Sequence, residues 1–276
     1  KKKKKKKKTQ NRGEHMHHGY YPRGTDRKSK TNAQAQVDLI DAVLTFAGVE
    51  NVTEMVDVGC GIGGSSRHVA NKFPSAKATG ITLSPKQAAR ANGLAEAQGL
   101  AERATFRVAD ALQQPFADGA FDLVWSLESG EHMPDKRRFV SELARVAAPS
   151  GRGTVVVATW VHRDLAEGEA DLTKKELKLL GRINRAYYLP PWCSGADYKA
   201  LFEASGLTGI KVEDWSPDVA PFWGEVIKTA LTPRGVVGLL RAGWGTIKGA
   251  LAMPLMARGF KRGLIKFVVI TGKTEA

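Results

Sequence analysis

The sequence contains little cysteine and no long apolar run. Its 276 residues include two cysteines, Cys60 and Cys193, too few for a disulfide framework or for an unaided tetrahedral zinc site. No stretch reaches the roughly 18 uncharged apolar residues that a membrane-spanning helix needs. The sequence therefore argues against a disulfide-stapled domain and a standard membrane span, and its low cysteine content is typical of a reducing compartment.

Acidic residues are outnumbered only at the two ends of the chain. The net charge is +14, but residues 1–30 carry 13 lysines and arginines against 2 acidic residues, and residues 215–276 carry 9 against 3. Residues 31–214 hold 20 basic and 23 acidic residues, so the middle of the chain is not typical of a nucleic-acid-binding surface. We therefore expect no nucleic-acid partner. Residues 1–8 are all lysine and are expected to form a disordered tail without a functional part.

Strand and helix patterns alternate along most of the chain, as in a parallel sheet covered by helices on both faces. Helices are expected at 32–47, 64–72, 84–99, 135–148, 171–186 and 195–204. Strands are expected at 54–59, 77–82, 104–110, 121–126, 151–160, 209–214 and 266–271. An insertion of about 50 residues separates the last two strands and is far longer than a usual connection. The predicted fold class is α/β, with a mostly parallel, Rossmann-like sheet of seven strands and a helical N-terminal cap.

The stretch VDVGCGIGG, residues 56–64, follows the first predicted strand. Gly59, Gly61 and Gly63 allow positive φ and a close approach to a ligand, and the helix that begins near residue 64 presents unpaired N–H groups. The turn satisfies the G-x-G-x-x-G pattern of dinucleotide sites. However, the second strand ends in GITLS without an acidic residue for the NAD ribose, and Asp57 suits an amine-bearing ligand better than a pyrophosphate. These features argue against NAD, while a tight turn without a ligand stays an alternative.

The glycine turn, the end of the second strand and Asp110 after the third together resemble the class I S-adenosylmethionine-dependent methyltransferases. That resemblance implies that the first motif carries the methionine end of S-adenosyl-L-methionine, that residues after the second strand bind ribose, and that residues after the third hold adenine. The residues implied are, in that order, Asp57, Gly59, Gly61 and Gly63; Thr82 and Gln87; and Asp110 and Ala111. Many members have a carboxylate where this chain has Ile81 and Thr82, so hydroxyl, amide or backbone groups must bind the ribose. Asp110 alone is also typical of a turn or helix cap.

Longer strings resemble a narrower family, the γ-tocopherol C-methyltransferases of plants and algae. They are EHMHHGYYPRG, WSLESGEHMPDK, LPPWCSGADYKALFEASGL, EDWSPDVAPFW and IKGALAMPLMARGFKRGLIKFVVITGK, within residues 12–273. The resemblance implies carbon methylation of a prenylated phenol, γ- to α-tocopherol and δ- to β-tocopherol, in vitamin E synthesis in the chloroplast, at the inner envelope or plastoglobule periphery. A branch of the family methylates the indole nitrogen of plant alkaloids, which stays an alternative acceptor. The alternative without catalysis is a basic RNA- or lipid-binding module on the same scaffold.

A base beside the phenol would help this chemistry, because a phenol with a pKa of about 10 is mostly neutral at neutral pH. The sulfonium already supplies the electrophile, so alignment provides most of the remaining rate and no metal is required. Glu128 and His132 follow the fourth predicted strand and would meet on one face if the segment is helical, giving a carboxylate-oriented imidazole. The alternative is that Glu128 and Glu131 cap the next helix and His132 is a partly buried polar residue.

The N-terminal string EHMHHGYY is expected to fold over the cofactor as a lid. His17 and His18 are adjacent and lack a carboxylate partner at helical spacing, so we do not predict a metal site. Tyr20 or Tyr21 is expected to contact the methionyl end or the sulfonium through cation–π attraction, with Tyr20 as a catalytic candidate and Tyr21 as a cofactor ligand. Simple packing of both rings is the alternative.

Aromatic residues after the fifth predicted strand are the candidates for the acceptor pocket. They are Trp192, Trp215, Phe222 and Trp223. Cys193 is interpreted as packing, because methyl transfer from a sulfonium needs no thiol nucleophile. Residues 233–262 carry an apolar stripe beside arginines and lysines, which predicts either peripheral membrane contact or a lid packed against the sheet.

These expectations divide the chain into four parts. Residues 1–8 form the tail, 9–50 the N-terminal lid and helix, and 51–160 the cofactor-binding core. Residues 161–276 form the acceptor-binding part of the same domain, with the insertion at 215–262.

Overall fold

The computed structural model describes residues 14–24, 30–222, 224 and 244–276, with the backbone alone described for 244–251. The predicted lysine tail and Trp223 lie outside the described residues. The same holds for residues 233–243 of the predicted membrane-contact segment.

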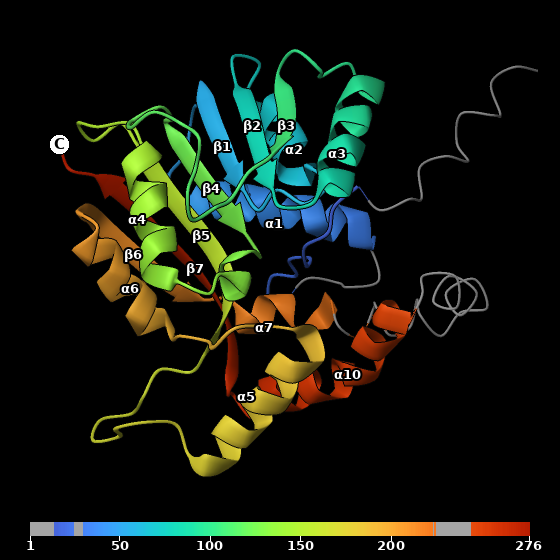
Figure 1. Ribbon diagram of the computed structural model, residues 1–276, viewed down its shortest axis with the longest axis vertical. Coiled ribbons are helices and arrows are strands. Elements are labelled where there is room, and N and C mark those ends of the chain that lie inside the picture. Colours follow the sequence, from blue (N-terminus) through green and yellow to red (C-terminus); the bar gives the residue numbers. More distant parts are fainter. Residues whose placement is uncertain (1–13, 25–29, 223, 225–243) are drawn as a thin grey trace, which may run out of the picture.

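Seven strands form one sheet in the order β3-β2-β1-β4-β5-β7-β6 (Figure 1). They are β1 (Glu54–Val58), β2 (Lys77–Thr82), β3 (Ala104–Val108), β4 (Leu123–Leu127), β5 (Thr154–His162), β6 (Leu207–Asp214) and β7 (Ile265–Thr274). Strands β1 to β5 are parallel to one another, and β7 is antiparallel to both β5 and β6. The predicted α/β class with a mostly parallel seven-stranded sheet is confirmed.

The strand order reverses at β1, which pairs with β2 on one side and with β4 on the other. In open α/β sheets, ligands bind beyond the carboxyl ends of the strands at such a point. The fold therefore places the loops after β1 and β4 at the favoured position for a site.

Helices α1 to α6 lie close to the predicted ranges, and α7 and α10 lie within the predicted insertion at 215–262. They are α1 (Asn32–Phe46), α2 (Gly64–Lys72), α3 (Pro85–Ala97), α4 (Lys136–Val146), α5 (Lys174–Tyr187), α6 (Gly195–Ala204), α7 (Ser216–Val219) and α10 (Trp244–Lys261). Helices α1, α3, α4, α5 and α6 begin at a side chain that accepts a hydrogen bond from the backbone N–H three residues on. Those caps satisfy otherwise unpaired groups and fix where each helix begins.

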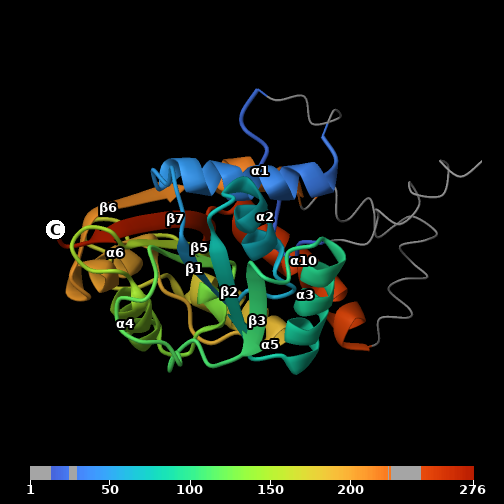
Figure 2. The same ribbon diagram turned by 90° about the horizontal axis from the view of Figure 1, so that it is seen from above.

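Helices cover both faces of the sheet. Apolar residues of α1, α5 and α10, such as Leu39, Ile183 and Met256, share a buried cluster with one face. Residues of α4 and α6, such as Phe139 and Phe202, pack against the other. Figure 2 shows α1 and α4 on opposite sides of the strands, and in Figure 1 helices α5, α7 and α10 gather at one end of the sheet.

Candidate active site

A cavity of about 500 Å³ lies at the carboxyl ends of β1 to β4, and we call it the strand-end cavity. Each of the loops after these strands contributes to its wall, and the N-terminal segment covers it with Met16 and His17. The predicted site residues that line it are Asp57, Gly59, Gly61, Thr82, Gln87, Asp110, Ala111, Glu128 and His132. The sheet thus brings together residues that are up to 75 positions apart in the sequence.

The glycine turn after β1 is shaped by close packing as well as by the cavity. Gly59, Gly61 and Gly63 all have positive φ, at 82°, 54° and 73°. A Cβ at Gly61 would stand 3.2 Å from Met16 Sδ, whereas a Cβ at Gly63 would stand 2.3 Å from the Phe106 ring. Gly63 does not line the cavity. The structure therefore does not bring Gly63 to the cavity lining, and its lack of a side chain makes room for Phe106.

Asp57 is a buried carboxylate at the base of the strand-end cavity. Its side chain is 2% exposed, and its Oδ2 accepts a hydrogen bond of 2.6 Å from Ser66 Oγ. Burial raises the pKa of Asp57 to about 6, although the hydrogen bonds from Ser66 and the charge of Arg67 oppose the shift. The group is therefore ionised at neutral pH and suits a ligand that carries an ammonium group.

The loops after β2 and β3 present hydrogen-bonding groups at the rim. Thr82 Oγ1 and Gln87 Oε1 lie 2.8 Å apart, so the hydroxyl and the amide bond to each other. Asp110 is exposed, and its Oδ1 accepts a hydrogen bond of 2.9 Å from the backbone N–H of Leu112. Asp110 therefore caps its own turn and also lines the cavity, which unites the two interpretations that the sequence left open.

The loop after β4 is not the helix that a pairing of Glu128 with His132 requires. Only Gly130–His132 form a short 3-10 helix, and Glu128 lies before it with a φ of 53°. Glu128 and His132 therefore do not share a helical face, and the hydrogen bonds of the Glu128 carboxylate go to His18 instead. The predicted pairing with His132 is corrected. Burial and the charge of Lys136 lower the pKa of His132, so this imidazole is neutral at neutral pH.

Glu128 and Glu131 are neighbouring buried carboxyls with opposite pKa shifts. Burial would raise the pKa of Glu128, but the charge and hydrogen bonds of His18 outweigh burial and hold the pKa below its usual value. Burial and the charge of Glu128 raise the pKa of Glu131 to about 7, although Glu131 Oε2 accepts a hydrogen bond of 2.8 Å from Thr159 Oγ1. Pairs of carboxyls whose environments separate their pKa values are typical of acid–base sites.

A second cavity of about 170 Å³ adjoins the first, and we call it the tryptophan cavity. Its lining is His18, Glu128, Glu131, His132, Trp160, Tyr187, Leu189, Trp192 and Met256. Glu128, Glu131 and His132 line both cavities. Within the part of the chain that the structure describes, the buried Nε1 of Trp192 has no hydrogen-bond partner. The tryptophan cavity therefore combines apolar walls with an indole donor and a group of titratable side chains.

Two predicted tyrosines lie away from both cavities. Tyr20 packs its ring on Trp215 at 5.0 Å between centroids, and Tyr21 is 3% exposed with its hydroxyl 3.4 Å from Asn32 Oδ1. Neither lines the strand-end cavity or the tryptophan cavity. The structure therefore does not bring Tyr20 or Tyr21 to either cavity, because both side chains pack between the N-terminal segment and its neighbours.

The predicted aromatic lining of the acceptor pocket is only partly brought together. Trp192 lines the tryptophan cavity, and Phe222 lies 5.1 Å from the His18 ring. Trp215 is a core residue whose Nε1 donates a hydrogen bond of 2.8 Å to Glu213, and the structure does not bring it to the lining of the tryptophan cavity. Cys193 packs against a core cluster, in line with its interpretation as a packing residue.

Sequence reasoning missed His18, Trp160, Tyr187, Leu189 and Met256 as lining residues of the tryptophan cavity. The string EHMHHGYY did signal His18, but the carboxylate that pairs with it is 110 positions away. No local spacing reveals that contact.

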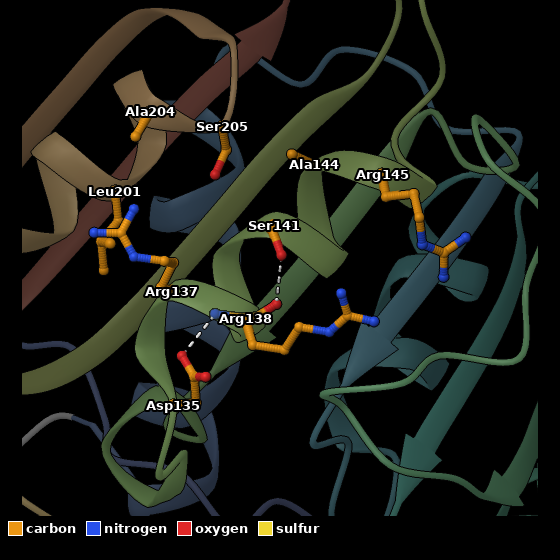
Figure 3. A pocket seen from close by; sticks show the side chains of 9 residues that line it. All are labelled: Asp135, Arg137, Arg138, Ser141, Ala144, Arg145, Leu201, Ala204 and Ser205. Carbon is orange, nitrogen blue, oxygen red and sulfur yellow. Dashed lines mark hydrogen bonds between the residues drawn. The ribbon is translucent and has the colours of Figure 1, made fainter.

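A third cavity, of about 610 Å³, lies between α4 and α6 (Figure 3). It contains none of the predicted site residues. Two of its arginines are already paired, Arg138 with Glu142 at 3.3 Å and Arg145 with Asp118 at 2.7 Å. Its position away from the carboxyl ends of β1 to β4 separates it from the candidate site, despite its larger volume. Among the described residues, no group of histidine, cysteine and acidic side chains is arranged to hold a metal ion.

Comparison with known proteins agrees with this geometry. A family model described as a methyltransferase domain matches residues 56–155. The geranyl diphosphate C-methyltransferase of Streptomyces coelicolor, solved with S-adenosyl-L-homocysteine, has the same fold, with a TM-score of 0.74, 21% identity and coverage of 94% of this chain and 89% of that one. The sheet, the strand-end cavity and the matched domain define a class I methyltransferase that uses S-adenosyl-L-methionine.

Proteins with higher sequence identity identify the family within this class. The chain is 56% identical to a probable tocopherol O-methyltransferase of Oryza sativa, covering 94% of this chain and 72% of that protein, and 55% identical to the tocopherol O-methyltransferase of Arabidopsis thaliana, covering 94% and 76%. Both are named chloroplastic. The ajmaline N-methyltransferase of Rauvolfia serpentina is more distant, at 40% identity over 94% of this chain and 90% of that protein. The chain belongs to the tocopherol methyltransferase family.

Proposed function

We propose that this enzyme methylates the phenolic ring of γ-tocopherol at carbon to give α-tocopherol, and that of δ-tocopherol to give β-tocopherol. The observation that carries the proposal is the junction of the two cavities at Glu128, Glu131 and His132. A methyl donor in the strand-end cavity would face an aromatic acceptor in the tryptophan cavity across this junction. The names of the rice and Arabidopsis relatives support tocopherol as the acceptor, and the atom that receives the methyl group is part of our proposal.

The strand-end cavity fits S-adenosyl-L-methionine because its polar groups match the two ends of that molecule. Asp57 offers a buried carboxylate for the amino group, and the N–H groups at the start of α2, where Gly64 and Ser65 line the cavity, suit the carboxylate. Asp110 and Ala111 at the other side would hold adenine, with Thr82 and Gln87 at the ribose. When bound, the cofactor supplies an electrophilic methyl group on a sulfonium. The residues of the chain would orient the cofactor so that this methyl group faces the tryptophan cavity.

The tryptophan cavity suits the ring of a chromanol. Trp160, Leu189 and Met256 give apolar contact, and the unpaired Nε1 of Trp192 among the described residues can donate to an acceptor oxygen. The carboxyl and imidazole groups at the junction lie where the phenolic hydroxyl would enter. These contacts favour a neutral aromatic alcohol. A second candidate, a nitrogen of a plant indole alkaloid, draws its support from the Rauvolfia relative, which is named an N-methyltransferase.

Peripheral membrane contact through residues 233–262 belongs to the same proposal. Helix α10 lines the tryptophan cavity with Met256, while Arg258, Lys261 and Arg262 are exposed near its end. A helix with these two sides can rest on anionic headgroups and receive a long-tailed acceptor from the bilayer. No helix in the described ranges is long and apolar enough to cross a membrane. We further propose a plastid location, at the inner envelope or plastoglobule periphery, in line with the chloroplastic relatives.

The test is to incubate the enzyme with methyl-labelled S-adenosyl-L-methionine and, separately, γ-tocopherol, δ-tocopherol and an indole alkaloid such as norajmaline. We expect labelled α- and β-tocopherol that keep a free phenolic hydroxyl. Mass spectrometry gives the number of methyl groups, and NMR gives the atom that carries each. A product methylated on oxygen would overturn carbon methylation, and transfer to the alkaloid alone would overturn the tocopherol assignment.

A further inference from the structure

The Glu128 carboxylate forms two hydrogen bonds with His18. Its Oε1 accepts a hydrogen bond of 2.6 Å from the backbone N–H of His18, and its Oε2 lies 2.6 Å from the ring Nδ1. Both side chains are largely buried, at 15% exposure for His18 and 10% for Glu128. A carboxylate is an acceptor only, so Nδ1 carries the proton and donates it. This arrangement fixes the tautomer and the orientation of the imidazole.

Glu128 adopts an uncommon backbone conformation to make this contact. Its φ of 53° lies in the left-handed region, which residues other than glycine rarely adopt. Its backbone N–H donates a hydrogen bond of 2.7 Å to Ala158 O on β5, so the strained residue is held by the sheet. Observed strain of this kind is often found at functional sites.

The His18 ring stands in the wall of the tryptophan cavity. It lies 4.9 Å from the Trp160 ring and 5.1 Å from the Phe222 ring, measured between centroids. Because Nδ1 is committed to Glu128, proton transfer from an acceptor would take place at the other ring nitrogen, Nε2. The carboxylate behind the ring would stabilise the imidazolium that results, as in other carboxylate–histidine pairs.

The N-terminal segment that carries His18 is fixed on both sides of it. Gln36 Nε2 donates a hydrogen bond of 2.5 Å to His17 O, and Tyr20 N donates one of 2.8 Å to Ala35 O, so α1 holds the backbone. Tyr21 N donates another of 2.8 Å to Asp218 O. The segment therefore supplies a defined side chain to the acceptor cavity and does more than cover the cofactor.

We propose that His18 is the general base for the acceptor, a catalytic role that rests on the proposed methylation of a phenol, with Glu128 as its positioning residue. His18 Nε2 takes the phenolic proton, and the electron pair of the phenolate ring carbon forms the new carbon–carbon bond. The methyl–sulfur bond breaks with its pair going to sulfur. The methylated ring carbon then loses its hydrogen as a proton to water, and the imidazolium returns its proton to the phenolic oxygen. One proton is released overall.

The test compares His18→Asn with a matched control, His68→Gln. Asparagine keeps an N–H donor for Glu128 but cannot act as a base, which preserves the fold of the segment. His68 also pairs with a carboxylate, Asp41 at 2.9 Å, but lies on α2 outside both cavities. We expect His18→Asn to lower the rate on γ-tocopherol by about 10² to 10⁴, and the control to keep the parent rate. Calorimetry with S-adenosylhomocysteine should give the same affinity within a few fold for all three proteins.

A readout specific to a base separates this role from a structural one. A chromanol carrying electron-withdrawing groups, so that its phenol is ionised at the assay pH, needs no base. The parent-to-variant rate ratio should therefore fall below about 10 on this acceptor, and the variant rate on γ-tocopherol should rise about tenfold per pH unit below the pKa of the phenol.

Two results would overturn the proposal for His18. One is an equal loss on both acceptors at every pH, which would mean a structural role, and the other is an unchanged rate on γ-tocopherol. A parent enzyme that methylates neither phenol would instead overturn the proposed function itself. The two failures are therefore distinguishable within the same assay.

Discussion

At the scale of single residues, the site depends on where each carboxyl group is placed. Asp57, Glu128 and Glu131 are all buried, yet each has a different partner: a serine hydroxyl, a histidine and a threonine hydroxyl. Only the partner of Glu128 can carry a positive charge, so only Glu128 has a lowered pKa. Ionising either of the other two in the folded protein costs stability.

Glu131 gives a prediction for how the stability of the fold depends on pH. Its pKa in the folded protein, about 7, lies above the value of about 4.5 expected when unfolded. The folded state therefore binds the proton more tightly, and stability is lost as pH rises from about 4.5 through about 7. Glu131→Gln removes this cost, so its free energy of unfolding relative to the parent should increase by roughly 2 kcal/mol between pH 5 and pH 8. Denaturant unfolding at both pH values measures it, and a constant difference would contradict the raised pKa.

Asp110 gives a prediction for cofactor affinity. Asp110→Ala should weaken binding of S-adenosylhomocysteine by roughly 1 to 3 kcal/mol, because the adenine amino group would lose a charged acceptor. Asp118→Ala serves as a control, since Asp118 is exposed and pairs with Arg145 away from the strand-end cavity. Calorimetry on both variants is the measurement. Equal affinities for Asp110→Ala and the parent would remove Asp110 from the cofactor site.

The sequence predicted residues of the strand-end cavity better than those of the tryptophan cavity, for a physical reason. Asp57 and Thr82 lie at the carboxyl ends of β1 and β2, and Asp110 lies just beyond β3. The carboxyl ends of parallel strands meet at one edge of a sheet. His18 and Met256 reach the tryptophan cavity from opposite ends of the chain. Such a meeting depends on tertiary packing, which no local spacing encodes.

At the scale of elements, the N-terminal segment is the piece that joins the two cavities. Met16 and His17 line the strand-end cavity, and His18 lines the tryptophan cavity. Gly19 follows directly, and a Cβ there would stand 2.7 Å from Ala35 Cβ on α1. The close packing of the segment against α1 therefore requires glycine at this position.

Gly19→Ala should displace the segment and misplace His18. A displacement near 1 Å can cost about 10²-fold in rate, so we expect a loss of about 10-fold or more in methylation. The segment should also become more sensitive to limited proteolysis. Gly93→Ala, on α3, adds the same methyl group where a Cβ would meet nothing within 4 Å, and should keep the parent rate. An unchanged rate for Gly19→Ala would show that close packing of the N-terminal segment against α1 is not needed to position His18.

Helix α10 gives a prediction for membrane binding. Changing Arg258, Lys261 and Arg262 together to Gln should reduce binding to anionic vesicles, since each basic residue near the surface contributes about 1 kcal/mol. The lysine run at 1–8 is removed from every protein compared, so that it cannot mask the effect. A control with the same loss of charge changes Lys199, Lys211 and Lys273, which are exposed on α6, β6 and β7.

Vesicle sedimentation measures this binding, and a short-tailed chromanol in detergent measures activity. The α10 variant should bind vesicles more weakly than the control variant and keep its activity on the short-tailed acceptor. Equal binding of the two variants would mean that the attraction is spread over the surface, and absence of binding by the parent would end the membrane proposal.

At the scale of the whole molecule, the alternating pattern of strands and helices was enough to predict the sheet. The predicted strand 77–82 and helix 64–72 have the observed bounds, whereas the predicted strand 266–271 became β7 (Ile265–Thr274). Strand β7 is longer because it pairs with β5 and β6 along both edges, which extends the ladder beyond its apolar centre. The loop around Glu128 lacks the helix that a pairing of Glu128 with His132 requires, and the Glu128 carboxylate bonds to His18 instead.

Methyl transfer where the two cavities meet can be tested by a crystal structure of the enzyme with S-adenosylhomocysteine and γ-tocopherol. We predict that the thioether sulfur lies in the strand-end cavity and the chromanol ring in the tryptophan cavity, with the unmethylated ring carbon facing the sulfur and the phenolic oxygen beside His18. A chromanol bound between α4 and α6, or one whose ring carbon faces away from the sulfur, would contradict methyl transfer at this junction.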